Sequence, residues 1–419
     1  MTQSKYELVS VQDALNIVLA HVQSLPPMRT PLSEAQGLVL AADAVANDYM
    51  PPFPSAGVDG FAIRTEDGAG DRRFLGEQMA GAVSGLAVSA DTAVRITTGA
   101  PVPPGADAVV MVEVAEERDG VVHIYQLPQP GDGIRPVGQD IRSGEVVLRR
   151  GTLLGAVEIG LLATIGMASV LAHPRPRVGI FSTGDELVEV DAPLAPGKIR
   201  DSNRYALIAA ARSAGCEPLS FGVARDNMKE VEAHLDQALS QADAVISSGG
   251  VSMGKLDLVK PLLDRKGTVH FGRVTMKPGK PITFATIDTK PVFALPGFPV
   301  SSLVSFELFV RPALRRMAGH VRVERPRIKV ALAHDVQHDA ARTEYQRAVA
   351  VARGGQYEAT TTGFQGSGRL LSMVGANVLL ELPVGRADFQ QGEVVAALVV
   401  GDIWSDEGSV LPSAGRGRP

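Results

Sequence analysis

Residues 243–257, DAVISSGGVSMGKLD, contain the pattern that decides the fold. A short apolar strand runs directly into a glycine-rich loop, as happens where a parallel strand of an α/β sheet leads to the next helix. The loop comes within one residue of a nucleotide phosphate loop, because Gly249, Gly254 and Lys255 have the required spacing but Leu256 replaces the hydroxyl residue that holds the metal. Two interpretations stay open: an anion-binding loop, and a glycine-rich turn in which Asp257 caps a helix.

Strands and helices alternate around this stretch. RVGIFSTG (177–184) and CEPLSFGVA (216–224) have the pattern of short buried strands, whereas NRYALIAAARSAG (203–215) and NMKEVEAHLDQALSQA (227–242) have helical periodicity. This alternation predicts right-handed crossovers and a doubly wound, mostly parallel sheet with helices on both faces. Ligands bind such sheets at the carboxyl ends of the strands, so the motifs STGDE and SSGGVSMGK should line one rim.

The rest of the chain predicts additional domains around this α/β core. We expect a mainly helical or extended linker region over 1–50 and 145–174, a β-rich domain over 51–144, the α/β domain over 175–322, a small β domain over 323–403, and a disordered tail over 404–419. Within the linker region, Ser10 precedes a predicted amphipathic helix, and residues 155–174 have a helical apolar pattern. The predicted fold class is therefore multidomain α/β and β, with an N-terminal α+β region that carries a β-rich insert and a small C-terminal β domain.

Composition excludes several classes of function. The formal net charge of -5 provides no general attraction for nucleic acid or anionic membranes, and no run of about 18 apolar residues is present to span a bilayer. The single Cys216 excludes an intrachain disulfide framework and is expected to be a small core residue. We expect a cytoplasmic protein that binds neither nucleic acid nor membranes.

Carboxylates follow the predicted strands at the same rim. Glu186 and Asp185 come after one strand, and Asp226 follows the next strand along the chain. Asp185 has two interpretations, a helix cap and a metal ligand, whereas Asp201 favours a helix cap. Asp257 adds a carboxylate two residues after Lys255. Because a hard cation such as Mg²⁺ is held by one or two carboxylates plus substrate phosphates, these residues are candidate metal ligands.

Basic and proline-rich turns complete the candidate anion site. Lys277 and Lys280 flank a Pro-Gly turn in MKPGKP, which is consistent with either an anion site or a solvated turn. Pro296 and Pro299 shape the approach to a helix N-terminus, where backbone N–H groups favour anions, although ordinary helix initiation explains them equally well. From the residues alone, the prediction is an α/β protein that binds an anionic, phosphorylated ligand with a divalent metal.

Taken together, these motifs resemble the molybdopterin molybdenumtransferase (MoeA) family, which is also found as the C-terminal part of gephyrin. The resemblance extends over residues 5–402 in the expected order. It rests on PPFPSAGVDGFA, RITTGAPVPPGADAVVMVE, GQDIRSGE, STGDEL, GKIRDSN, SSGGVSMGKLD, MKPGKP, ALPGFPVSS and GFQGSGRLLSM. Each motif is degenerate by itself, but their ordered occurrence is specific.

The resemblance implies a reaction and a set of site residues. The family inserts molybdate into adenylated molybdopterin and releases AMP and the finished molybdenum cofactor, with Mg²⁺. The implied catalytic residues are Asp59, Thr98, Asp140, Glu186 and Asp226, and the implied metal ligands are Glu186, Asp226 and Asp257. The implied substrate-binding residues are Gly249, Gly250, Ser252, Gly254, Lys255, Lys277, Lys280, Pro296, Pro299, Arg347 and Ser367.

The resemblance also implies partners. It implies a homodimer with the active site at the subunit interface, and contact with the molybdopterin adenylyltransferase and with molybdoenzyme chaperones. The chain departs from the family pattern at 54–58, which read PSAGV in place of Asp-Asn-Ser-Ala-Met, and at Phe298, where the family has Asn. These departures keep an alternative open, in which the chain is a divergent, non-catalytic paralogue that binds or delivers molybdopterin or the molybdenum cofactor.

Overall fold

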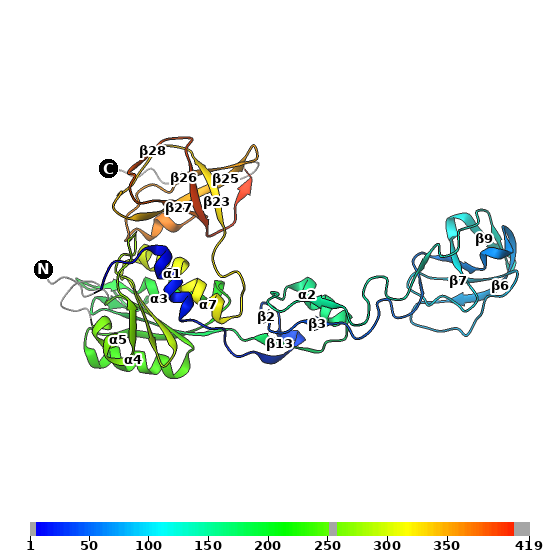
Figure 1. The fold of residues 1–419 in the computed structure, drawn as a ribbon, viewed down its shortest axis with the longest axis horizontal. Helices are drawn as coiled ribbons and strands as arrows, with labels where there is room; N and C mark the ends of the chain where they lie inside the picture. Colours follow the sequence, from blue (N-terminus) through cyan, green and yellow to red (C-terminus); the bar gives the residue numbers. More distant parts are fainter. Residues whose placement is uncertain (1–5, 251–257, 406–419) are drawn as a thin grey trace. The chain divides into compact units, whose positions relative to one another are not determined.

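Two units, each with its own apolar core, make up the chain in a computed structural model that describes residues 6–250 and 258–405 (Figure 1). The larger unit comprises the described parts of Met1–Met28, Gly37–Ala41 and Leu171–Pro419, and the smaller unit comprises Arg29–Gln36 and Ala42–Val170. In the part of the chain that is described, no helix is long and apolar enough to cross a membrane.

A six-stranded sheet organises the larger unit. Its order is β17 (Glu217–Ala224), β14 (Arg177–Thr183), β18 (Ala244–Ser248), β22 (Lys290–Leu295), β21 (Thr283–Ile287) and β19 (Thr268–Phe271). The first four strands are parallel, and β21 and β19 are antiparallel to their neighbours. The sheet is therefore mostly parallel, as the alternation of strands and helices predicted.

Helices cover both faces of this sheet. They are α1 (Val11–Ala20), α3 (Ser202–Ser213), α4 (Met228–Gln241), α5 (Val259–Lys266), and the continuous helix formed by α6 (Pro299–Ser305), the π-helical turn η4 (Phe306–Val310) and α7 (Arg311–Met317). Ile246 of β18 packs in the core shared with α1, α3, α6 and α7, whereas Val245 packs in the core shared with α4 and α5. Because alternate side chains of one strand enter opposite cores, the sheet is doubly wound, which confirms the predicted fold class. Figure 1 shows helices on both sides of this sheet.

A closed β domain follows the last helix. Its strands are β23 (Arg327–Leu332), β24 (Val336–Gln337), β25 (Thr343–Arg353), β26 (Gln356–Thr361), β27 (Val378–Leu382), β28 (Asp388–Phe389), β29 (Val394–Val399) and β30 (Trp404–Ser405), with a 3₁₀ turn at η5 (Leu370–Met373). The order β25-β26-β23-β29-β27 returns to β25, so the sheet closes as a small barrel. Trp404 and Ser405 pair with β25, so the first two residues of the segment predicted as a disordered tail form a short strand.

One strand of the α/β region joins this barrel. The segment β20 (Met276–Lys277) pairs in parallel with the start of β25, and Lys277 lies opposite Glu344 in the register. Tyr345, Leu379 and Leu398 of the barrel also belong to the core that contains α1 and α7. The barrel and the α/β sheet are thus packed together within the larger unit.

The smaller unit is built from short strands. They are β1 (Met28–Pro31), β3 (Ala44–Val45), β4 (Ser55–Ala56), β5 (Gly60–Ile63), β6 (Gly70–Gln78), β7 (Thr92–Ile96), β8 (Ala108–Met111), β9 (Ala115–Arg118), β10 (Val121–Ile124), β11 (Ile134–Arg135) and β12 (Val146–Leu148). The strand β2 (Val39–Leu40) and most of β13 (Ser169–His173) belong to the larger unit. One helix, α2 (Ala156–Thr164), and the 3₁₀ turns η1 (Leu32–Glu34), η2 (Thr65–Asp67) and η3 (Val112–Val114) complete the elements. Six of the strands form one sheet in the order β8-β5-β7-β6-β10-β9.

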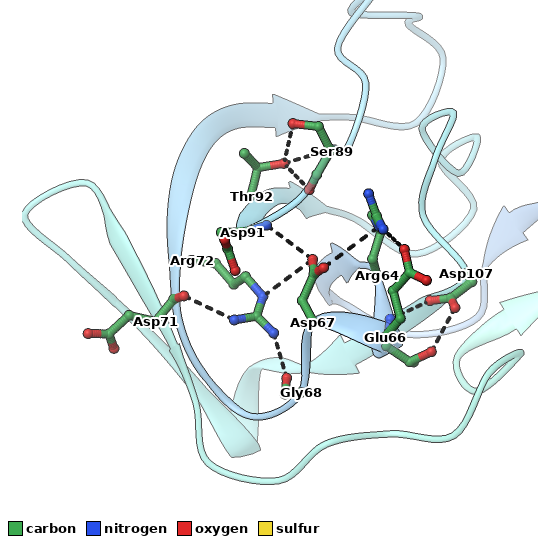
Figure 2. A network of polar contacts seen from close by, with 11 residues as sticks. Arg64, Glu66, Asp67, Gly68, Asp71, Arg72, Ser89, Asp91, Thr92 and Asp107 are labelled. Carbon is green, nitrogen blue, oxygen red and sulfur yellow. Dashed lines mark hydrogen bonds and ion pairs between the residues drawn. The ribbon is translucent and has the colours of Figure 1, made fainter.

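A network of polar contacts secures one end of this sheet (Figure 2). The buried Arg72 donates hydrogen bonds to the carbonyl oxygens of Asp71 and Gly68, and its Nε lies 4.0 Å from a carboxylate oxygen of Asp67. Asp67 in turn accepts a hydrogen bond from the backbone N–H of Asp91 at 3.1 Å. The buried guanidinium is therefore compensated by carbonyl groups and a carboxylate, which is the role of a structural ion pair.

The helix predicted over 155–174 is wrong in its second half. Helix α2 ends at Thr164, and β13 begins at Ser169. Gly166 has a φ of 77° and donates its N–H to the Ala163 carbonyl, which is the left-handed conformation that ends many helices. Val170 and Ala172 are then buried at alternate positions, so the period changes from helix to strand without a change in apolar content.

Candidate functional site

A cavity of about 1400 Å³ lies in the larger unit, lined by the carboxyl ends of β14, β18 and β22 and by the barrel. Its lining includes nine of the site residues expected from the sequence: Glu186, Asp226, Gly249, Gly250, Lys277, Lys280, Pro296, Pro299 and Ser367. The rim predicted for the parallel sheet supplies Glu186, Asp226 and the two glycines to this cavity, and the lysines and Ser367 come from segments beside the barrel. A cavity of this size accepts a ligand larger than a single nucleotide base.

Two carboxylates line one side of the cavity. Glu186 and Asp226 follow β14 and β17, whose carboxyl ends are neighbours in the sheet. Asp185 and Asp226 exchange hydrogen bonds, because the backbone N–H of each donates to the carboxylate of the other at 3.2 and 3.1 Å. No helix begins at Asp185, which stands in a turn before β15 (Leu187–Val188), so its interpretation as a helix cap is wrong. This turn fixes the two loops to each other at the rim.

The first half of the glycine-rich loop packs against β14. Gly249 and Gly250 have φ values of 95° and 64°, and a Cβ at Gly249 would lie 2.5 Å from the carbonyl oxygen of Thr183. Only glycine fits this conformation and this close approach. Ser252, Gly254, Lys255 and Asp257 lie outside the described residues. Among the described residues, no group of three or more His, Cys, Asp or Glu side chains is arranged to hold a metal ion.

The helix cap at Asp201 is confirmed, and its neighbour Asn203 faces the cavity. Asp201 is the N-cap of α3 and accepts a hydrogen bond from the backbone N–H of Arg204. The Asn203 amide donates to the Ser248 hydroxyl at 2.8 Å and to the Gly297 carbonyl at 2.7 Å. Its own Oδ1, and Oγ1 of Thr183, are buried without a hydrogen-bond partner among the described residues. Both residues line the cavity, beside Gly249 and Gly250.

Two lysines also line the cavity. The Lys277 ammonium lies 3.2 Å from a carboxylate oxygen of Glu344, which comes from the first residues of β25 and is 1% exposed. Lys280 lines the cavity three residues further along the same turn. An ammonium group held by one buried carboxylate keeps two of its N–H groups for other acceptors. The Pro-Gly turn is thus a wall of the cavity and not a free surface turn.

Arg347 lies behind the cavity wall and does not line the cavity. Its side chain is fully buried, and it donates to the Ser372 hydroxyl and to the Gly366 carbonyl at 3.1 and 3.3 Å. Burial lowers the pKa of this guanidinium to about 10. Ser367, by contrast, lines the cavity, and its carbonyl accepts the N–H of Val300 at the start of α6. Arg347 therefore holds the loop that presents Ser367.

The other three predicted residues belong to the smaller unit. Asp59 accepts hydrogen bonds from the backbone N–H and the hydroxyl of Thr98 at 2.7 and 2.9 Å. The backbone and then the side-chain hydrogen bond from Thr98 lower the pKa of this exposed carboxyl group. Asp140 forms an ion pair with Arg135. Asp59 and Thr98 are thus one hydrogen-bonded pair, and Asp59 is ionised at neutral pH.

Sequence reasoning missed some of the cavity wall. Glu344 and Arg342 line the cavity, and nothing in their local sequence singled them out. Phe364 also lines it and lies in the motif GFQGSGRLLSM, but it was not named as a site residue. Glu344 has one long-range signal, its register opposite Lys277, which appears only when β20 and β25 are paired. Cys216 is buried as expected, and burial raises the pKa of its thiol to about 12.

Three family models match three successive regions of the chain. Residues 9–166 match the MoeA N-terminal region (domain I and II), residues 179–316 match a probable molybdopterin binding domain, and residues 329–400 match the MoeA C-terminal region (domain IV). The middle match contains the sheet rim described above, and the last match contains most of the barrel.

Individual proteins agree with this assignment. The chain is 37% identical to the molybdopterin molybdenumtransferase of Haemophilus influenzae over 87% of this chain and 91% of that protein. It is 36% identical to gephyrin of Dictyostelium discoideum over 96% of this chain, but it spans only 63% of that longer protein. The crystal structure of the molybdopterin biosynthesis MoeA protein from Pyrococcus horikoshii superimposes with a TM-score of 0.81 at 31% identity, covering 94% of this chain and 99% of that one. The chain therefore belongs to the MoeA family, the molybdopterin molybdenumtransferases of molybdenum cofactor biosynthesis.

Proposed function

We propose that this chain inserts molybdate into adenylated molybdopterin and releases AMP together with the molybdenum cofactor. The observation that carries the proposal is the cavity of the larger unit, in which Glu186 and Asp226 line one side and Lys277 and Lys280 line another. A phosphoanhydride needs cations for its own charge and carboxylates for the metal that accompanies it. Both sets of groups line the same cavity.

The basic wall and the glycines are suited to the phosphate groups. Lys277 keeps N–H groups for acceptors other than Glu344, and Lys280 adds a second positive charge nearby. Gly249 and Gly250 bring backbone close to the cavity without side chains in the way. In this proposal the two lysines stabilise the negative charge that develops on the leaving AMP phosphate as the phosphoanhydride is hydrolysed.

The carboxylates fit a divalent cation in number and kind. Glu186 and Asp226 supply hard oxygen ligands at the rim, and Asp257, outside the described residues, is the proposed third ligand. Mg²⁺ is usually bound by one or two protein carboxylates plus substrate phosphates, which agrees with two described carboxylates beside the basic wall. When bound, Mg²⁺ would neutralise phosphate charge and orient the phosphoanhydride.

The proposal extends to a homodimer and to the smaller unit. The Asp59–Thr98 pair and Asp140 are assigned to catalysis by their places in the family motifs, with Asp59 as an ionised carboxylate at neutral pH. We place the complete site at the interface of two subunits, by analogy with the family. The proposed partners are the molybdopterin adenylyltransferase, as the source of the adenylated substrate, and molybdoenzyme chaperones, and the proposed location is the cytoplasm.

The test is an AMP-release assay on the purified full chain. Adenylated molybdopterin and Mg²⁺ are supplied with and without molybdate, and AMP is quantified by chromatography. We expect molybdate to accelerate AMP release, and Asp226→Asn to suppress the release without loss of folded protein. Glu232→Gln, at a half-buried position of α4 that pairs with Arg265 and Lys266 and does not line the cavity, is the matched control and should retain activity.

The same assay separates the enzyme from a carrier. If the chain binds the adenylate tightly but molybdate does not stimulate AMP release, the non-catalytic alternative replaces this proposal. Phe298, at the position where the family has Asn, is the feature of the cavity that favours testing that alternative.

A further inference from the structure

Two phenylalanine rings in the cavity are exposed. Phe298 is 62% exposed and Phe364 is 74% exposed, although both line the cavity. Other phenylalanines of the larger unit, such as Phe181, Phe284 and Phe306, are almost completely buried. Exposed aromatic rings inside a concave site are unusual, because burying such a ring is favourable, and they mark a place where a ligand covers them.

Both rings lie against one loop. A Cβ at Gly366 would stand 2.5 Å from Cε1 of Phe364, and a Cβ at Gly368 would stand 3.4 Å from Cδ1 of Phe298. Residue 366 must therefore be a glycine for the Phe364 ring to keep this position. Phe298, between β22 and α6, and Phe364, in the loop after β26, thus both pack against the backbone of residues 366–368.

The loop itself is firmly attached. The side chain of Gln365 accepts the N–H of Arg347 at 2.9 Å and donates to the carbonyl of Arg347 at 3.1 Å. The Gly366 carbonyl accepts from the buried Arg347 guanidinium, and the Ser367 carbonyl accepts from Val300. The rings are therefore presented by a loop that is fixed in advance, which reduces the entropy lost when a ligand binds them.

The surroundings decide the class of ligand. The rings share the cavity with Lys277, Lys280 and Arg342 on the basic side and with Glu186 and Asp226 at the rim. A ligand that contacts both the phenylalanine rings and the basic residues has a flat ring system and a phosphate group. Aromatic side chains bind such rings through their faces, and the electron-poor rings of nucleobases and pterins stack well on them.

We propose that Phe298 and Phe364 form a stacking site for a planar heteroaromatic ring that carries a phosphate group. This inference rests on the proposed function, because adenylated molybdopterin contains two rings of this chemistry, a pterin and an adenine. The pterin ring and the adenine ring are therefore tested with separate probes. In this proposal Phe298 binds the ligand through its ring, at the position where the family has a polar Asn.

The experiment measures binding by isothermal titration calorimetry with neopterin monophosphate, AMP and the ring-free ribose 5-phosphate. Phe298→Leu, Phe364→Leu and the double variant keep apolar bulk but remove the aromatic face. Tyr357→Leu, an exposed aromatic residue on β26 that does not line the cavity, is the matched control. We expect the double variant to raise the Kd of one or both ring-bearing probes by about tenfold or more, with no change for ribose 5-phosphate.

The outcomes separate the inference from the proposed function. A loss confined to neopterin monophosphate assigns the site to the pterin, and a loss confined to AMP assigns it to the adenine. Unchanged Kd values in the double variant, an equal loss for ribose 5-phosphate, or no binding of either ring-bearing probe by the unaltered chain would overturn the inference. Ring-dependent binding without molybdate-stimulated AMP release would leave the stacking site in place and reject only the proposed reaction.

Discussion

At the scale of single residues, Asp201 connects the sheet to the helix that follows it. The carboxylate is 1% exposed, caps α3, accepts from the Ser182 hydroxyl, and pairs with the buried Arg204 guanidinium at 2.8 Å. Asp201→Ala removes the cap and leaves Arg204 with Glu189 as its remaining carboxylate partner. We expect the free energy of unfolding of the larger unit, measured by urea denaturation, to fall by about 3 kcal/mol.

A second helix cap provides the comparison. Asn227 caps α4 by accepting the N–H of Glu230, but it is exposed and pairs with no buried charge. Asn227→Ala should therefore lower the free energy of unfolding by only about 1 kcal/mol. Equal losses for the two variants would show that the buried ion pair of Asp201 adds nothing to the cap.

His320 predicts a dependence of stability on pH. Burial, and then the positive charges of Arg315 and Arg311, lower the pKa of its imidazole to about 4. As the pH falls below 6.5, the His320 imidazole is protonated in the unfolded chain before it is protonated in the folded chain, and this favours unfolding. The folded state is therefore most stable, with respect to His320, above pH 6.5, and it loses stability as the pH falls toward 4. We expect the difference in urea midpoint between pH 7.5 and pH 5.0 to be smaller in His320→Gln than in the unaltered chain. The same difference in both proteins would contradict this assignment.

At the scale of elements, the pairing of β20 with β25 controls the position of Lys277. Glu344→Gln keeps the shape of the side chain but removes the buried carboxylate that holds the ammonium group. Loss of orientation should lower kcat by about tenfold, whereas KM should not rise, because the variant also removes a negative charge from the cavity.

The control for this prediction is an ion pair on the same barrel. Glu358→Gln breaks the pair between Glu358 and Arg353 at 2.8 Å on β25 and β26, and neither residue lines the cavity. This variant should retain both kinetic constants. A Glu344→Gln enzyme with an unaltered kcat would mean that Lys277 needs no positioning from the barrel.

The same elements explain how far sequence reasoning reached. Strand and helix periodicity locates Glu186, Asp226 and Gly249 at one rim, because the carboxyl ends of parallel strands always meet. Periodicity could not locate Glu344, since β20 has only two residues and its partner lies more than sixty positions away. It also misjudged 155–174, where Gly166 ends a helix inside a segment of uniform apolar content. Local patterns therefore predicted the sheet and its rim, and the long-range pairing of β20 with β25 placed Glu344 beside Lys277.

At the scale of the whole molecule, the two units carry different parts of the proposed chemistry. The larger unit contains the cavity with its carboxylates, lysines and exposed rings, and the smaller unit contains the Asp59–Thr98 pair and Asp140. Because both units belong to one MoeA-family chain, we propose that they act in the same reaction. That proposed reaction has two products, AMP and the molybdenum cofactor.

The most direct measurement quantifies both products in one reaction. Purified chain, adenylated molybdopterin, Mg²⁺ and molybdate are incubated together, AMP is measured by chromatography, and the molybdenum cofactor is measured by reconstitution of a molybdenum-free molybdoenzyme. We predict that AMP and active cofactor appear in equal amounts and that both depend on molybdate. Release of AMP without cofactor, or tight binding of the adenylate with neither product, would contradict the proposed molybdate insertion.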